Sequence, residues 1–232
     1  MTSADTRHDS LTRVGTDTLL WGGVVGAAEF IVVFLVEGVL RSDYDPFRLQ
    51  VSYLSLGDDG WIQVASFLVA GVLLAGSALG VRRVLRGGIG NTSVPIAIGL
   101  GGAGLVIAGV FSTMPAFGYP PGTPPGFPTN IPATAYLHVV GAMFFFGGLV
   151  AAPLLMARRM HADGAAVAAF ASVATAIAVL VFFGASSADS SGQPFFPAIA
   201  GLLQRVSIIA GLGWVAALAL WLLRRTRSES TS

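Results

Sequence analysis

Residues 61–83 read WIQVASFLVAGVLLAGSALGVRR, an apolar run with one strongly polar side chain near its start, Gln63, and two arginines at its end. As a helix, the interval from Gln63 to Arg82 rises about 28 Å, close to the thickness of a bilayer's hydrocarbon core. Two later runs repeat the arrangement, with His138 ahead of Arg158-Arg159 and Arg205 ahead of Arg224-Arg225. The pattern predicts three helices that cross a membrane in the same direction.

The composition favours the same class of protein. Hydrophobic residues make up 54% of the chain and charged residues 11%, whereas about 25% of residues in soluble domains are charged. The net charge of +1 gives no indication of a nucleic-acid partner. The sequence has no cysteine, and all 13 basic side chains are arginine, which excludes disulfides, thiolate metal sites and lysine Schiff bases. Arginine without lysine, with much alanine and glycine, is typical of a GC-rich bacterial or archaeal gene.

The chain is therefore predicted to be an all-α, polytopic integral membrane protein. A single six-helix domain, residues 18–223, is expected between a polar N-terminal tail (1–17) and a C-terminal tail (224–232). Each span is close to the ~20 apolar residues that a crossing requires, and the six are expected at 18–40, 61–82, 94–114, 133–157, 165–186 and 198–223. The first 17 residues lack a basic start and a small-residue cleavage site, so we expect the first helix to be retained.

The distribution of arginines predicts the orientation. Ten of the 13 lie in the N-terminal tail, the second and fourth connections and the C-terminal tail. By the positive-inside rule these segments are cytoplasmic. An even number of helices also requires both termini on one side. We expect a multi-pass protein of the cell membrane with cytoplasmic N- and C-termini.

The three outer connections differ in character. Residues 41–60 are expected to carry a short surface helix, with Asp45 as N-cap, Pro46 at the first helical position and Gly57 after its end. This segment is either a lid or interfacial anchor, or a plain surface loop with one buried face. Residues 116–131 are rich in proline and glycine and are expected to be extended. Residues 186–197 end in two phenylalanines suited to anchoring at the membrane interface.

Several polar residues are expected at one depth near the outer ends of the helices: Glu37, Gln63, Thr113, His138 and Arg205. An arginine inside a span faces the bundle interior and takes an acidic partner. We expect an Arg205–Glu37 pair, with Glu29, about 12 Å deeper, as the alternative. Such a pair either fixes helix packing, holds an anionic head group or takes part in catalysis.

Two other polar residues keep alternative interpretations. His138 is either a hydrogen-bonded core residue or a ligand-binding or catalytic group. Glu29, near the middle of its span, is either a neutral, hydrogen-bonded carboxyl group or a proton relay. His8 and His161 fall on the opposite side from His138, so no metal site is expected, and nothing indicates a cofactor.

A glycine pattern at 99–104, GLGGAG, satisfies the dinucleotide-binding spacing but lies inside an apolar span with no preceding strand. We interpret its glycines, and the Gly22/Gly26 and Gly76/Gly80 pairs, as positions where helices approach one another closely.

The segment from residue 37 to residue 61 resembles a known family. The matching residues are Glu37-Gly38, Arg41, Tyr44-Asp45-Pro46, the stretch VSYLSLG at 51–57, and Gly60-Trp61, with further matches at Gly109-Val110-Phe111, His138 and Gln204-Arg205. Together they resemble the bacterial and archaeal membrane proteins grouped as domain of unknown function 998. Met114-Pro115 departs from the pattern, because an acidic residue is expected before the proline. The resemblance implies a six-helix integral membrane protein and supplies no reaction.

These residues lead to three hypotheses about function. The first is a membrane module that binds a lipid or small amphiphile in an outward-facing polar pocket, with the segment 45–57 as lid. Its ligand-binding candidates are Glu37, Arg41, Tyr44, Ser52, Gln63, His138 and Arg205. The second is a membrane-embedded enzyme that uses Glu37 or Asp45 with His138 for acid–base chemistry on a lipid-like substrate. The third is a proton-coupled transporter acting through Glu29. Membrane lipids are the expected partners, and the sequence leaves catalysis and oligomeric state open.

Overall fold

The computed structural model describes residues 3–187 and 194–228. Within them the chain forms six α-helices: α1 (Ser3–Leu40), α2 (Gly60–Val84), α3 (Ser93–Val110), α4 (Ala133–Ala162), α5 (Ala166–Ser186) and α6 (Ala200–Ser228). All six are long and apolar enough to cross a membrane. The prediction of an all-α protein with six spans is confirmed.

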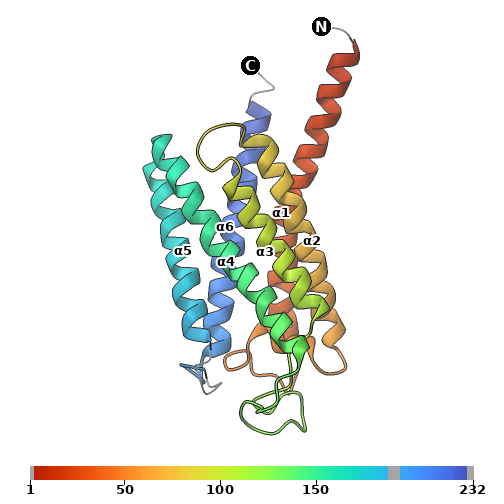
Figure 1. Ribbon diagram of the computed structural model, residues 1–232. Coiled ribbons are helices and arrows are strands. Elements are labelled where there is room, and N and C mark those ends of the chain that lie inside the picture. The colour runs from red at the N-terminus through yellow and green to blue at the C-terminus, as the bar shows by residue number, and fades with distance from the viewer. Residues whose placement is uncertain (1–2, 188–193, 229–232) are drawn as a thin grey trace.

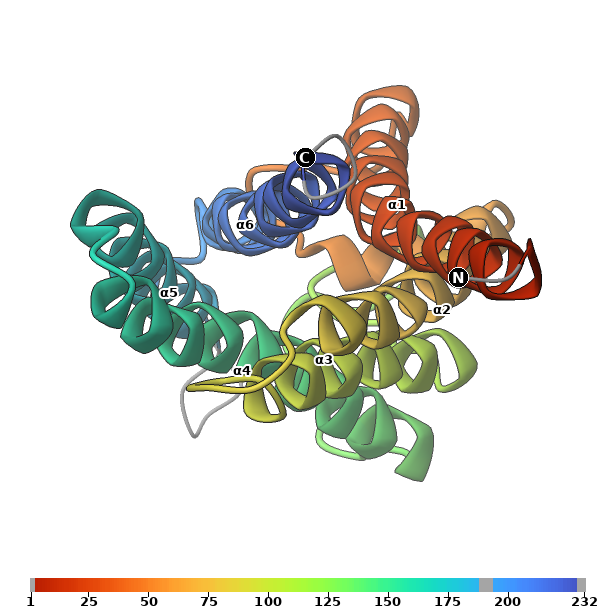
Figure 2. The same ribbon diagram turned by 90° about the horizontal axis from the view of Figure 1, so that it is seen from above.

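The helices form a closed ring in chain order (Figures 1 and 2). Each packs against the next, and α6 closes the ring by packing against α1. The start of α1 and the end of α6 lie at the same end of the bundle (Figure 1). We call this end, which carries the arginine pairs, the arginine end. The opposite end carries the connections 41–59 and 111–132, and we call it the loop end.

The helix bounds differ most from the expected spans in four helices. The segment expected as a polar tail continues α1 as helix from Ser3, and this part extends beyond the bundle (Figure 1). The α3 helix ends at Val110 instead of residue 114. One physical reason is that His138 bonds to the carbonyls of Ala108 and Phe111, which at a helix end have no intrahelical partner. The helices α4 and α6 continue past their arginine pairs.

Glycine allows the closest helix contacts. A Cβ atom at Gly102 of α3 would lie 2.6 Å from the backbone nitrogen of Ala75 and 2.7 Å from the carbonyl oxygen of Gly71, both on α2. A side chain there would force the two helices apart. The interpretation of residues 99–104 as a close-packing stretch is thus supported by the geometry.

The connection 41–59 does not form the expected surface helix. Asp45 accepts a hydrogen bond from the backbone N–H of Phe47 (2.9 Å), but it caps only a turn. A separate 3-10 helix, η1 (Val51–Ser55), follows. Residues Val51 and Leu54 are 1% and 0% exposed, and η1 lies inside the mouth of the helix ring (Figure 2). Burial of these apolar side chains in the bundle draws the segment inward. We call residues 44–56 the plug.

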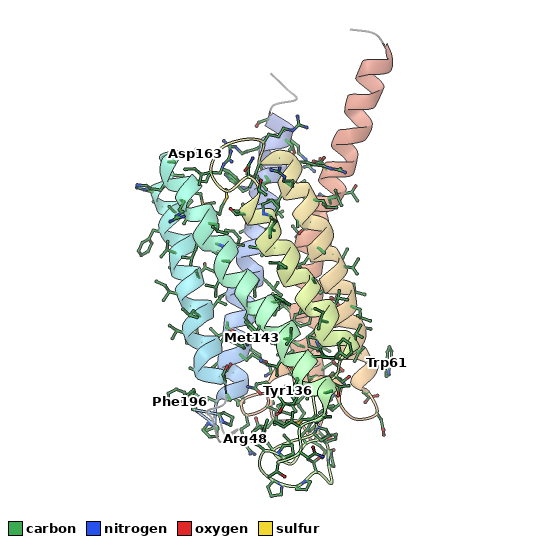
Figure 3. All side chains as sticks on the ribbon, in the orientation of Figure 1. Arg48, Trp61, Tyr136, Met143, Asp163 and Phe196 are labelled. Atoms are coloured by element: carbon green, nitrogen blue, oxygen red, sulfur yellow. The ribbon has the colours of Figure 1, made fainter. Side chains whose placement is uncertain are left out.

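Aromatic side chains surround the loop end. Trp61, Tyr136 and Phe196 are exposed and lie near this end of the molecule, opposite Asp163 (Figure 3). Exposed tryptophan and tyrosine at the ends of spanning helices are typical of membrane interfaces. The predicted anchoring pair Phe195-Phe196 is exposed, whereas residues 188–193 of the same connection lie outside the described residues.

Candidate functional site

The plug is fixed to α6 through Arg205. Its guanidinium donates hydrogen bonds to the carbonyl oxygens of Pro46 (2.7 Å) and Leu49 (2.9 Å), and to the Tyr44 hydroxyl (2.6 Å). A fourth bond reaches Gly201 on its own helix (3.1 Å). The guanidinium also lies 5.4 Å from the centre of the Tyr44 ring, within the range of a cation–π contact. Arg205 therefore binds the backbone of the plug.

This arrangement contradicts the expected partner of Arg205. Glu37 forms an ion pair with Arg41, and the acceptors of Arg205 are the Tyr44 hydroxyl and three backbone carbonyls. Neither Glu37 nor Glu29 is a partner of Arg205, so the expected Arg205–Glu37 pair and its Glu29 alternative are wrong. The plug instead supplies backbone carbonyl oxygens, which accept hydrogen bonds from the buried, positively charged guanidinium of Arg205. Arg205 lies near the loop end of the helices, but its hydrogen-bond partners outside α6 belong to the connection 41–59 and not to α1.

Two further hydrogen bonds attach the plug to α6, one through the Gln204 side chain and one between backbone groups. The side-chain oxygen of Gln204 accepts a hydrogen bond from the Val51 N–H (2.8 Å). The backbone N–H of Leu202 donates to the Phe47 carbonyl (3.0 Å), which satisfies a free donor in the first turn of α6. Gln204 was part of the family resemblance but not among the predicted ligand-binding residues.

The Tyr44 hydroxyl links this attachment internally. It accepts from Arg205 and lies 2.9 Å from the carbonyl oxygens of both Leu49 and Gln50. Burial raises the pKa of Tyr44 to about 12, although the neighbouring Arg205 opposes this rise. Burial also raises the pKa of Tyr53. Both phenols are therefore neutral hydrogen-bonding groups at physiological pH.

His138 of α4 holds the plug from the opposite side of the ring. Its Nδ1 is 3.0 Å from the Ala108 carbonyl oxygen and 2.9 Å from that of Phe111. Both atoms are acceptors only, so Nδ1 carries the hydrogen and Nε2 accepts from the Ser52 hydroxyl at 3.0 Å. No carboxylate is among these partners. The expected pairing of His138 with Glu37 or Asp45 for acid–base chemistry is not formed.

A small cavity adjoins this histidine. It has a volume of about 20 Å³, and its polar lining comes from Ser52, His138 and Gln204 among mostly aromatic and aliphatic side chains. This space suits about one water molecule. It offers no room for a lipid-like substrate.

A much larger pocket opens at the loop end. It has a volume of about 640 Å³ and lies where the end of α1, the start of α2 and the connection after α3 meet. Its lining residues are Glu37, Leu40, Arg41, Ser42, Asp43, Leu56, Gly57, Asp58, Asp59, Ile62, Tyr119, Pro120 and Pro121. We call it the loop-end pocket.

Arg41 organises the walls of this pocket. It forms an ion pair with Glu37, one helical turn earlier. It also donates to the carbonyl oxygens of Leu56 (3.0 Å) and Asp59 (2.7 Å) and to the Tyr119 hydroxyl (3.1 Å). One side chain thereby joins α1, the end of the plug, the start of α2 and the connection 111–132.

The structure thus divides the predicted ligand-binding set. Glu37 and Arg41 line the loop-end pocket, whereas Tyr44 and Arg205, and Ser52 and His138, are pairs that hold the plug. Gln63 is fully buried and belongs to neither group. The pocket residues missed from the sequence are Asp43, Asp58, Asp59 and Tyr119. The adjacent acidic residues 58 and 59 only weakly indicated a polar site. No local sequence pattern indicated that Tyr119 would line the same pocket.

Glu29 lies apart from all of these groups. Its carboxylate faces Ser66 of α2. Farther toward the arginine end, α1 and α2 touch through Gly26, Ala70 and Leu73. Beyond this apolar contact the Ser77 hydroxyl of α2 lies beside Gly23 of α1, and the transport hypothesis stays a prediction.

Six membrane-spanning helices in a closed ring, with an internal plug and one large pocket at the plugged end, define a polytopic membrane protein. The family model described as "Protein of unknown function (DUF998)" matches residues 24–221, and the chain belongs to this family. No curated protein and no solved structure matches this chain. The resemblance noted at residues 37–61 is confirmed, and it extends over most of the chain.

Proposed function

We propose that the protein binds a lipid or other small amphiphile from the surrounding membrane in the loop-end pocket, and that the bound head group carries an amine or quaternary ammonium group. The observation that carries this proposal is the lining of the pocket. Four carboxylates and one arginine surround about 640 Å³, a volume in the usual range of small-molecule sites.

The charge balance selects the head group. Arg41 neutralises Glu37 through their ion pair, which leaves Asp43, Asp58 and Asp59 as uncompensated negative charges on the lining. A cluster of one sign attracts the opposite charge and repels its own. An amine or quaternary ammonium group therefore fits this pocket better than an anionic head group, which was one of the alternatives for Arg205.

The apolar part of the amphiphile has a place beside the pocket. Leu40 lines the pocket and is 77% exposed, and its neighbour Val39 is 82% exposed. Trp61, at the start of α2, is 67% exposed. Exposed apolar side chains at the end of spanning helices face the acyl region of the bilayer, and an acyl chain there gains about 0.8 kcal/mol per buried CH₂.

Native mass spectrometry with defined lipids tests the proposal. Phosphatidylethanolamine, which carries an amine, is expected to remain bound more than phosphatidylglycerol, which is anionic. The double variant Asp58→Asn/Asp59→Asn should weaken the amine-bearing lipid roughly fivefold, because each exposed charge contributes a fraction of a kcal/mol. Asp163→Asn, at the arginine end, is the matched control and should change nothing. Equal retention of both lipids, or no effect of the double variant, contradicts the proposal.

A further inference from the structure

Polar atoms without hydrogen bonds gather between α1 and α2. Among the described residues, seven buried side-chain nitrogen and oxygen atoms lack a partner, and five of them are on four residues of this interface. They are Glu29 Oε2, Glu37 Oε2, Gln63 Oε1, Gln63 Nε2 and Ser66 Oγ. Leaving one such atom unpaired costs about 1–3 kcal/mol, so their concentration at one interface indicates a bound polar species.

The helix register places three of these residues together. Ser66 faces Glu29, and Gln63 lies three residues before Ser66, on the same face of α2. Gly26, one turn from Glu29, lies against Ala70 and Leu73, which gives the same register. Gln63 is 0% exposed, so its amide group is directed into the bundle and away from solvent.

The chemistry of this group suits a cation. Glu29 and Gln63 each offer an unpaired oxygen, and the Ser66 hydroxyl oxygen lies beside the Glu29 carboxylate; oxygen is the ligand type that hard cations prefer. Among the described residues, no arginine forms an ion pair with Glu29; the carboxylates of Glu37 and Asp163 take Arg41 and Arg159. One carboxylate with two neutral oxygens balances a single positive charge, which favours a monovalent ion.

The loop-end pocket lies where α1 ends and α2 begins, on the loop-end side of this group. Glu37 lines the pocket and contributes another unpaired buried oxygen at the same interface. The acidic residues Asp58 and Asp59 on the pocket lining raise the local concentration of cations. Toward the arginine end the α1–α2 contact is close, as at Gly80 against Leu19 and Leu20.

We propose that a monovalent cation of the Na⁺ class binds between α1 and α2 on Glu29, Gln63 and Ser66, and reaches this site from the loop-end pocket. The site is distinct from the amphiphile site. It stabilises the packing of α1 on α2 by compensating a carboxylate inside the membrane.

Carbodiimide labelling tests this inference on the full-length protein. Dicyclohexylcarbodiimide reacts with protonated carboxyl groups in apolar surroundings, and a bound cation that replaces the proton prevents the reaction. Labelling of Glu29, located by peptide mass spectrometry, is expected to fall about tenfold when Na⁺ reaches roughly ten times its Kd. N-methyl-D-glucamine chloride at equal ionic strength provides the comparison. Labelling that is independent of Na⁺ overturns the inference and indicates a proton-only carboxyl group.

Variants separate the site from a general effect of salt. Gln63→Leu and Ser66→Ala keep Glu29 and should retain labelling while losing protection by Na⁺. Ser77→Ala is the control, because this buried serine on the same helix donates to the Leu74 carbonyl (2.7 Å), and it should keep full protection. Protection that survives in both Gln63→Leu and Ser66→Ala also overturns the inference. Retention of phosphatidylethanolamine is a separate readout, so either proposal can fail alone.

Discussion

Arg205 of α6 donates a 2.6 Å hydrogen bond to the hydroxyl of Tyr44, a residue 161 positions away in the sequence. With its bonds to the Pro46 and Leu49 carbonyls, this contact makes a buried arginine the main attachment of the plug to the helix ring. His138 and Arg41 hold the same segment through Ser52 and Leu56. Arg205, His138 and Arg41 were predicted to line one ligand-binding pocket. Each of them instead binds a different part of the plug.

Replacing Arg205 is expected to release the plug. Arg205→Leu removes the arginine donors from the carbonyls of Pro46 and Leu49 and from the Tyr44 hydroxyl, and we expect a loss of about 3 kcal/mol or more in the free energy of unfolding. Arg205→Lys should recover only part of it, because an ammonium group lacks the planar fork. Hydrogen exchange of residues 44–56 measures the release. Arg48→Ala, an exposed arginine in the same segment, should leave exchange unchanged, and slow exchange in Arg205→Leu would contradict the attachment.

The contact between Ser52 and His138 is expected to be a direct coupling. His138→Ala removes donors from two carbonyls and an acceptor from Ser52, so it should cost about 2–3 kcal/mol, against about 1 kcal/mol for Ser52→Ala. A double-mutant cycle should give a coupling of about 0.5–1.5 kcal/mol. Thermal unfolding in detergent provides the measurement. Strict additivity of the two variants is the result that rejects the contact.

High pH is expected to destabilise the protein through Tyr44. Its pKa is about 12 in the folded state because of burial, against about 10 for an exposed tyrosine. The folded state thus holds the proton more strongly, and the stability contribution is complete below pH ~10 and lost as pH rises toward ~12. Tyr44→Phe should lose less stability over this pH window than the unchanged protein. The measurement is unfolding as a function of pH, monitored by tyrosinate absorbance. Equal losses in both proteins would refute the assignment.

The orientation in the membrane can be tested with single cysteines, because the chain has none of its own. The positive-inside rule predicts that the arginine end is cytoplasmic. Exposed positions at the two ends are Asp58 and His161. A membrane-impermeant maleimide should label Asp58→Cys in intact cells and His161→Cys only after permeabilisation. The reverse pattern would invert the orientation and place the loop-end pocket on the cytoplasmic side.

Close packing of α2 on α3 is expected to depend on Gly102. Gly102→Ala places a methyl group 2.6 Å from a backbone nitrogen of α2, and the required helix shift should cost about 1–3 kcal/mol. Gly99→Ala is the control on the same helix, because its Cβ would meet its nearest atom, in Ala78, at 3.6 Å. Unfolding of both variants in detergent distinguishes the two positions. Equal stability would show that the helices separate at little cost.

The sequence alone determined the class of protein, the number of spans, the shared side of the two termini and the family. These properties depend on the length and hydropathy of local segments, and each span can be recognised without knowing its neighbours. The same depth counting located Glu37, His138 and Arg205 near the loop end.

The tertiary structure decided the partners of those residues. Arg205 binds carbonyls of the plug, His138 binds Ser52 and the end of α3, and Glu37 binds Arg41. The sequence predicts how deep a residue lies along its helix. Whether two residues touch also depends on which way each helix face is turned and on where the connecting segments run. The apolar residues Val51 and Leu54 draw the plug into the ring, and this packing brings backbone acceptors to an arginine that sequence reasoning had assigned to a carboxylate.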